Sequence, residues 1–315
     1  MRNSDRIDVH QHVVPAFWAD ELSANGGDPS GWQTPEWTPE KAIAFMDSQQ
    51  ISTGVLSLTA PGVVGWRGHE RRDMARRVNE YTAGLVASHA GRFGNFATLP
   101  LPDLDGALLE LEHVRRTLQV DGVVLLSNYG GRYLGEPMFD PLWAELALRG
   151  MLVFIHPTKP PIDVMEGIPG PIVDYPFDTT RTAVQLVLNG VLTRYPTLRI
   201  ILSHAGGFLP YASMRFAQAG AAVHGAPLTP EGVLHDLRSF YFDTALSTSA
   251  AALAGLTAFA RPDHILFGSD YPYASEAMSA TFTRELDHQI SLDVGRRASI
   301  NRANALALFP RLSRC

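Results

Sequence analysis

The feature that most constrains the fold is a series of eight short, β-branched apolar runs that recurs along the whole chain. They span residues 6–10, 53–59, 93–101, 122–128, 152–157, 199–207, 240–246 and 265–272. Each is an almost continuous hydrophobic run, which is typical of strands buried on both faces. Helical patterns lie between them, at 38–50, 72–90, 103–119, 139–150 and 178–196. Strand followed by helix, repeated, predicts parallel strands joined by right-handed crossovers.

Two architectures are compatible with this alternation. Eight strand and helix units can close into a (β/α)8 barrel, which takes about 250 residues or more. An open doubly wound sheet would more often carry a glycine-rich phosphate loop after its first strand, whereas "HQHVVP" stands here. We therefore predict an α/β protein with one (β/α)8 TIM barrel domain over residues 1–315, because no linker, repeat or low-complexity tract divides the chain.

Two connecting segments, 18–37 and 157–176, are too long for simple turns and are rich in Gly and Pro. Such segments usually form loops over the active site, so we expect them to cover the carboxyl end of the barrel. The tryptophans in or beside these loops could line an aromatic pocket or pack against the barrel. They are Trp18, Trp32, Trp37 and Trp66.

Composition excludes several classes of function. The net charge is -6, so no basic surface for nucleic acid is expected, and the arginines of 71–77 alternate with acidic residues as on a solvated helix. No apolar run approaches the roughly 20 residues that cross a bilayer. The polar N-terminus lacks a secretory pattern, which predicts a cytoplasmic protein. The only cysteine is Cys315, which excludes an intrachain disulfide and a thiolate metal site.

Polar residues stand at the ends of the predicted strands. His10 and His12 are one residue apart and would point to the same side of the first strand. His156, His204 and Asp270 end later strands. Because a barrel gathers these ends at one mouth, we predict a site for one divalent ion, with Zn²⁺ favoured and Mn²⁺ possible. The alternative is that each histidine is structural.

Two aspartates close to these residues have less certain roles. Asp243 lies on the seventh predicted strand, where it could support a metal ligand or be a hydrogen-bonded core carboxylate. Asp8 precedes His10 by two residues and could orient a histidine ring.

Four motifs in this order, "IDVHQH", "VFIHP", "SHAGG" and "FGSDYP", resemble the amidohydrolase superfamily. The resemblance covers nearly the whole chain and is to a branch of metal-dependent decarboxylases that includes aminocarboxymuconate-semialdehyde and 6-methylsalicylate decarboxylases. It implies that one metal ion is ligated by His10, His12, His156 and Asp270. His204 would stand beside the ion as an acid or base.

The resemblance also has consequences for metal number and subunits. Binuclear members bridge two ions with a lysine of the fourth strand, but "GVVLLSN" has none, which implies a mononuclear site unless Lys159 folds back. Arg215, eleven residues after His204, would reach a partner's substrate carboxylate across a homodimer interface. Its alternative is an arginine on a helix surface. A second carboxylate-binding arginine is missing from "EKAIAFMD", which puts a muconate dicarboxylate in doubt.

Two chemistries share this ligand set. A decarboxylase would protonate the carbon that bears the carboxylate of a hydroxylated aromatic or unsaturated acid, with His204, Asp270 or metal-bound water as the catalytic proton source. A hydrolase would activate water against an amide, lactone or ester. Another lyase or cyclisation step, or a barrel that no longer catalyses, is also compatible with the fold. The resemblance and the missing lysine favour the decarboxylase.

Overall fold

The computed structural model describes residues 6–163, 165–224 and 228–312, and its central element is an eight-stranded sheet in which every neighbouring pair is parallel. Its strands, in spatial order, are β1 (Arg6–Val13), β2 (Ile51–Leu58), β3 (Phe93–Thr98), β4 (Gly122–Leu126), β7 (Leu152–His156), β8 (Arg199–Leu202), β9 (Tyr241–Asp243) and β10 (Ile265–Leu266). A short antiparallel pair, β5 (Asn128–Tyr129) and β6 (Arg132–Tyr133), stands apart from it. Spatial order follows chain order, as in a barrel of consecutive strand and helix units.

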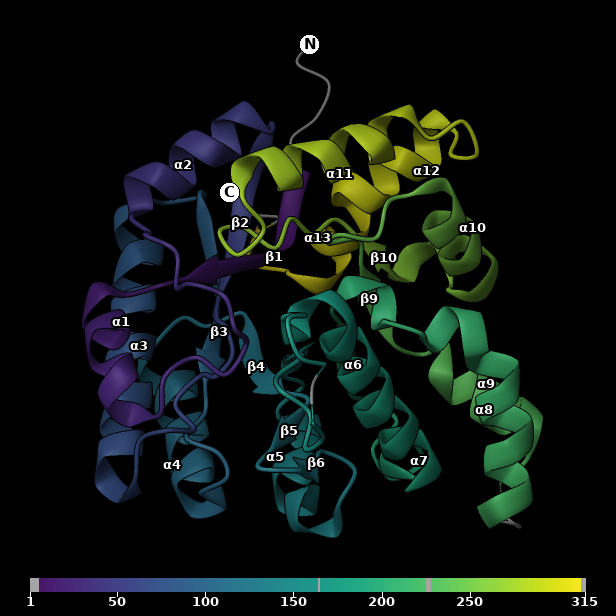
Figure 1. Ribbon diagram of the computed structural model, residues 1–315, viewed down its shortest axis with the longest axis horizontal. Coiled ribbons are helices and arrows are strands. Elements are labelled where there is room, and N and C mark those ends of the chain that lie inside the picture. Colours follow the sequence, from purple (N-terminus) through teal and green to yellow (C-terminus); the bar gives the residue numbers. More distant parts are fainter. Residues whose placement is uncertain (1–5, 164, 225–227, 313–315) are drawn as a thin grey trace.

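The sheet closes because the residues that follow β10 bond back to β1. The amide of Val9 donates to the carbonyl of Phe267 at 3.0 Å, and the amide of Asp270 donates to the carbonyl of His10 at 2.8 Å. Gln11 and Tyr271 form a parallel bridge. Figure 1 shows the result, with the last helices lying back beside the first strand. The predicted (β/α)8 barrel is therefore confirmed.

Helices stand between successive strands on the outside of the barrel, and the last helices follow the last strand (Figure 1). They are α1 (Ala16–Leu22), α2 (Pro39–Ser48), α3 (Gly68–Ser88), α4 (Leu104–Thr117), α5 (Asp140–Leu148), α6 (Gly170–Leu188), α7 (Val191–Arg194), α8 (Leu209–His224), α9 (Pro230–Leu237), α10 (Ala250–Phe259), α11 (Glu276–His288), α12 (Val294–Ala298) and α13 (Asn304–Leu308). Thr38 caps α2, because its hydroxyl accepts the amide of Lys41 at 3.2 Å.

The helix predicted over 178–196 differs from the observed one. It begins earlier, at Gly170, and it breaks after Leu188. Gly190 has a φ of 71°, a left-handed conformation that ends α6 and lets α7 start in a new direction.

Several strands end earlier than the apolar runs suggest. β8 ends at Leu202 and β10 at Leu266, so His204 and Asp270 lie in the turns that follow and not on the strands. Both residues have positive φ, 52° and 61°. Non-glycine residues adopt this conformation rarely and often at functional sites, where the surrounding structure holds them.

The amino end of the barrel is closed by apolar packing. Strand residues such as Ile7, Phe96 and Phe154 fill the interior and contact the C-terminal segment, which contributes Leu308 and Phe309. The ring of Phe309 lies 5.9 Å from that of Phe96. This packing leaves the carboxyl end as the open one.

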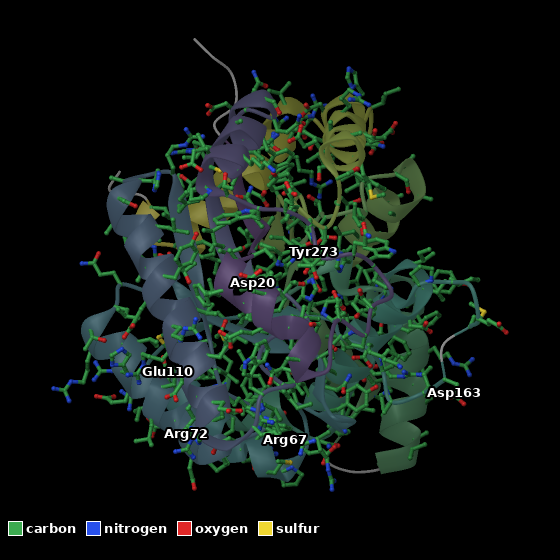
Figure 2. All side chains as sticks on the ribbon, turned by 60° about the vertical axis from the view of Figure 1, so that its left-hand side comes forward. Asp20, Arg67, Arg72, Glu110, Asp163 and Tyr273 are labelled. Atoms are coloured by element: carbon green, nitrogen blue, oxygen red, sulfur yellow. The ribbon has the colours of Figure 1, made fainter. Side chains whose placement is uncertain are left out.

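The two long connections only partly form loops. The first contains most of α1 and a turn of 3₁₀ helix, and the second ends in the first turns of α6. Figure 2 shows the middle of the second, at Asp163, projecting from the side of the molecule. Cys315 lies outside the described residues, and no helix within them is long and apolar enough to span a membrane.

Candidate active site

Four predicted ligands converge at the carboxyl end of the barrel. His10 and His12 come from β1, His156 from the end of β7, and Asp270 from the turn after β10. Each is buried, and one ligand atom from each lies within 4.8 Å of the others. The four side chains are brought together as the sequence predicts, and their geometry can hold one metal ion.

The hydrogen bonds on the Nδ1 side of each ring indicate its tautomer. The Nδ1 of His10 lies 2.8 Å from the Oδ2 of Asp243, and that of His156 lies 2.8 Å from the carbonyl of Pro157. Carbonyls and carboxylates only accept, so both Nδ1 atoms carry the proton. His12 places its Nδ1 3.1 Å from the hydroxyl and 3.3 Å from the carbonyl of Ser57. In the neutral form of each of the three rings, the Nε2 atom is thus left with a free lone pair.

This arrangement fits a cation. The Nε2 atoms of His10 and His12 are only 3.1 Å apart, and the Oδ1 of Asp270 lies 3.2 and 3.0 Å from them. Lone pairs that face one another at this distance repel unless a positive charge lies between them. Imidazole nitrogens with one carboxylate are donors that Zn²⁺ and similar ions accept.

The pKa values of these residues also indicate that a positive charge is favoured at the centre of the cluster. Burial opposes protonation of His10, but Asp243 and Asp270 outweigh it and raise the pKa of His10 to about 10. Burial, assisted by the neighbouring histidines, holds the pKa of His156 well below its usual range. Although burial acts the other way, His10, His12 and His204 together hold the pKa of Asp270 well below normal. His156 is therefore available as a neutral ligand and Asp270 as an anionic one.

Asp243 contacts a candidate ligand directly, which favours the supporting role over that of a core carboxylate alone. One of its oxygens contacts His10, and the other accepts the amides of His204 and Ala245, each at 2.9 Å. It therefore orients one candidate ligand and positions the turn that carries His204. Gly268 allows this approach, because a Cβ there would lie 2.9 Å from the Cβ of His10.

Asp8 acts on the backbone and not on a histidine ring. Its carboxylate accepts the amide of His10 at 3.1 Å, together with the amide at 3.0 Å and the hydroxyl of Ser269. Burial raises the pKa of Asp8 to about 7. Asp8 thus ties β1 to the turn that carries Asp270.

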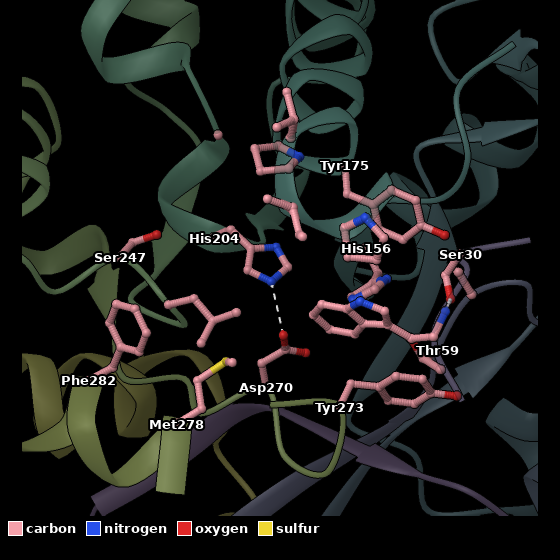
Figure 3. A pocket seen from close by; sticks show the side chains of 18 of the residues that line it. Ser30, Thr59, His156, Tyr175, His204, Ser247, Asp270, Tyr273, Met278 and Phe282 are labelled. Carbon is pink, nitrogen blue, oxygen red and sulfur yellow. Dashed lines mark hydrogen bonds and ion pairs between the residues drawn. The ribbon is translucent and has the colours of Figure 1, made fainter. Parts of the chain in front are cut away.

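His204 lies beside the four clustered residues and faces the cavity. Its Nε2 is 3.3 Å from the Oδ2 of Asp270, the contact drawn in Figure 3. Its Nδ1 is buried and has no hydrogen-bond partner among the described residues. An imidazole in contact with a carboxylate at the edge of a cavity is placed for proton transfer.

A cavity of about 550 Å³ opens over His156, His204 and Asp270. Both long connections contribute to its wall, as expected from the sequence, through Trp32 and Tyr175 among others. Its size is that of a small-molecule site. Of the four tryptophans considered above, Trp18, Trp37 and Trp66 are instead buried in the core.

Two further residues named by the sequence lie away from this cavity. Lys159 is exposed on the segment that follows β7 and does not line the cavity. Arg215 lies exposed on α8 and does not line the cavity of its own chain.

Sequence reasoning missed several residues that the structure places in the site. Ser57 supports His12 from β2, and Asp28, Tyr175 and Tyr273 line the cavity. Tyr273 comes three residues after Asp270 and could have been found from that motif. The others stand in irregular segments or among ordinary strand residues, where no pattern marks them.

Comparisons with known proteins agree with this geometry. The Amidohydrolase family model matches residues 7–311. A 6-methylsalicylic acid decarboxylase of Penicillium expansum is 40% identical and covers 98% of this chain and 97% of its own length. The crystal structure of an amidohydrolase II has a TM-score of 0.91 at 29% identity, with 97% and 100% of the two chains covered. The structure of 5-carboxyvanillate decarboxylase from Novosphingobium aromaticivorans, complexed with manganese, has a TM-score of 0.85 at 25% identity, with 97% and 96% covered. This chain belongs to the amidohydrolase superfamily, in its branch of decarboxylases.

Proposed function

We propose that this chain is a metal-dependent carboxy-lyase that releases CO₂, without oxidation, from a hydroxylated aromatic or unsaturated carboxylic acid. The observation that carries the proposal is the meeting of His10, His12, His156 and Asp270 beneath a cavity that His204 also lines. The membership in the decarboxylase branch supports the type of reaction.

The site residues have two proposed roles, metal ligation and proton transfer. His10, His12, His156 and Asp270 would hold one divalent ion. When bound, the ion supplies a Lewis acid that orients the substrate's carboxylate and neighbouring oxygen. His204, whose Nε2 lies 3.3 Å from the Oδ2 of the anionic Asp270 at the cavity edge, would deliver a proton to the carbon that bears the carboxylate, and Asp270 would hold the imidazole in place for that step. A new C–H bond forms there, the bond to the carboxylate breaks, and its electron pair returns to the ring as CO₂ leaves.

The proposed ion is Zn²⁺, with Mn²⁺ as the alternative. A donor set of three imidazoles and one carboxylate is compatible with both, and the choice between them often follows availability. Elemental analysis of the protein purified without added metal identifies the resident ion, and about one equivalent is expected per chain.

We also propose that a second copy of this chain binds over α6 and α8. Phe177, Phe208 and Tyr211 leave apolar surface exposed there, with Tyr211 89% exposed, and a groove runs between the two helices. Arg215 lies on the same helix and would reach the substrate carboxylate in the other copy's cavity. The Arg215→Ala variant is expected to raise KM about tenfold, through loss of a charged contact. A variant that keeps both the dimer and wild-type turnover would contradict this role.

The principal test combines metal content with CO₂ release. Purified protein is given a panel of ortho-hydroxybenzoates and muconate-type acids before chelation, after chelation and after metal is restored. The proposal expects CO₂ from at least one acid, loss of release on chelation and recovery on reloading, with the circular dichroism unchanged. Metal without CO₂ release, but with cleavage of an ester, lactone or amide, would support a hydrolase instead. The cytoplasmic location, the absence of a nucleic-acid partner and the single-domain organisation remain predictions.

A further inference from the structure

One side of the active-site cavity carries polar groups that the proposed chemistry does not use. Asp28 comes from the connection between α1 and α2, Tyr175 from α6, and Tyr273 from the turn after Asp270. Figure 3 shows the hydroxyls of Tyr175 and Tyr273 directed to the same side of the cavity as Ser30. Three separate segments thus bring their polar atoms to one wall.

These atoms lack partners in the protein. The Oδ2 of Asp28 and the hydroxyls of Tyr175 and Tyr273 are buried and have no hydrogen-bond partner among the described residues. Tyr175 as a whole is only 5% exposed. A buried polar atom without a partner costs free energy, so such a group usually marks a place that a ligand or water fills.

The carboxylate of Asp28 is held in place. Its Oδ1 accepts the amide of Ser30 at 2.8 Å, and the hydroxyl of Ser30 accepts the amide of Trp32 at 3.1 Å. These turns leave the Oδ2 free as an acceptor. Tyr273 connects this wall to the proposed metal site, because its ring packs edge-on against that of His12, with the ring centres 5.7 Å apart. A ring bound at the proposed metal site therefore lies beside this wall.

The charges around the wall favour a neutral donor over an anion. Burial, together with the negative charge of Asp28, raises the pKa of both Tyr175 and Tyr273. No Lys or Arg is found among the residues that line the cavity in the described part of the chain. Arg215 of a second copy is already assigned to the reacting carboxylate. A second carboxylate on the substrate would therefore meet Asp28 with no cation to offset the repulsion.

We propose that Asp28, Tyr175 and Tyr273 form a subsite for a second, neutral hydroxyl on the substrate ring, remote from the reacting carboxylate. The subsite rests on the proposed function, because it assumes that a hydroxylated acid binds over the clustered histidines. It selects substrates with a hydrogen-bond donor at that position and rejects those with a second carboxylate or a methoxy group. Trp32, Ile172 and Phe282 supply apolar surface for the rest of the ring.

The test compares 2-hydroxybenzoate with its 3-, 4- and 5-substituted derivatives, each with hydroxyl, methoxy or carboxylate. KM and kcat are measured for each acid, and dissociation constants are measured by calorimetry on the metal-loaded protein. One hydroxyl isomer is expected to bind about tenfold more tightly than 2-hydroxybenzoate, and its methoxy and carboxy counterparts more weakly.

Variants test whether Asp28, Tyr175 and Tyr273 cause the preference for one hydroxyl isomer. Asp28→Asn keeps an oxygen for the amide of Ser30 but replaces the free acceptor with a donor. It is expected to raise the KM of the preferred dihydroxy acid about tenfold more than that of 2-hydroxybenzoate, with a smaller change in kcat. The carboxy derivative is expected to bind this variant more tightly than it binds the wild type. Tyr175→Phe and Tyr273→Phe are expected to reduce the same preference. Asp20→Asn is the matched control, since Asp20 is exposed on α1, outside the cavity (Figure 2).

The outcomes separate the subsite from the proposed function. CO₂ release with no preference for any hydroxyl isomer would overturn the subsite and leave the decarboxylase. Preferential binding of one isomer that Asp28→Asn abolishes would support the subsite even if no CO₂ were released. Equal weakening of every acid in all three variants would show a purely structural role and overturn the proposal.

Discussion

The side chains at the two ends of the barrel are similarly buried, but they differ in chemistry and in role. At the amino end, buried side chains such as Phe96 and Phe309 are apolar and contribute packing alone. At the carboxyl end, His10, Asp243 and Asp270 are equally buried but polar, and they contact one another. Burying these charged groups costs stability, which only the pairing and a bound ion offset. The comparison teaches that stability is concentrated at one end of this barrel and chemistry at the other.

The largest effect is expected from Asp270→Asn. The substitution keeps the shape but removes the anionic oxygen near His12 and the contact with His204. We expect kcat/KM for CO₂ release to fall by about 10³-fold or more, with little change in thermal unfolding. Steady-state kinetics and circular dichroism check this. A variant that keeps a substantial share of wild-type activity would remove Asp270 from the mechanism.

The reverse pattern is expected from Phe309→Ala at the amino end. Phe309 is fully buried against the strand interior, so its loss leaves a cavity worth about 3–5 kcal/mol of unfolding free energy. The folded variant should retain its kcat. Denaturant unfolding and kinetics at low temperature measure the two quantities, and Phe309→Leu is the milder control. A large loss of kcat in the folded variant would show that the two ends are coupled.

An intermediate effect is expected from Asp243→Asn, which acts on the metal site through His10. Loss of the charged contact at 2.8 Å should weaken metal affinity about 10–100-fold, the usual result of removing such a supporting group. Competition with a chelator measures the affinity, and excess metal should restore much of the activity. Unchanged affinity would return Asp243 to the role of a core carboxylate.

The smallest effect is expected from Thr38→Ala. Helix α2 begins after the connection that leaves the carboxyl end of β1, so this cap lies on the same side as the active site. Its loss should lower the unfolding free energy by about 1 kcal/mol without affecting CO₂ release. An accompanying loss of activity would mean that α2 helps to shape the cavity. It would also show that a residue at the carboxyl end of the barrel can influence catalysis without lining the cavity.

Much of the fold could be predicted because its signals are local. Each buried strand appears in the sequence as a short apolar run, and the helix predicted from residue 38 begins at the cap that Thr38 provides. Boundaries were less predictable. The turns at His204 and Asp270 leave the sheet through positive φ angles that no propensity encodes, so the strands appeared longer than they are.

The sequence by itself predicted the barrel and the polar residues at its strand ends, because periodicity and strand-end position follow from local rules. The family resemblance then reduced those residues to four expected ligands. Only the tertiary structure decided that Asp243 supports His10, that Asp8 serves the backbone, and that Arg215 lies outside its own cavity. It also decided that Asp28, Tyr175 and Tyr273 share one wall. These relations depend on side-chain directions across segments distant in sequence, and packing sets those directions only when the barrel closes.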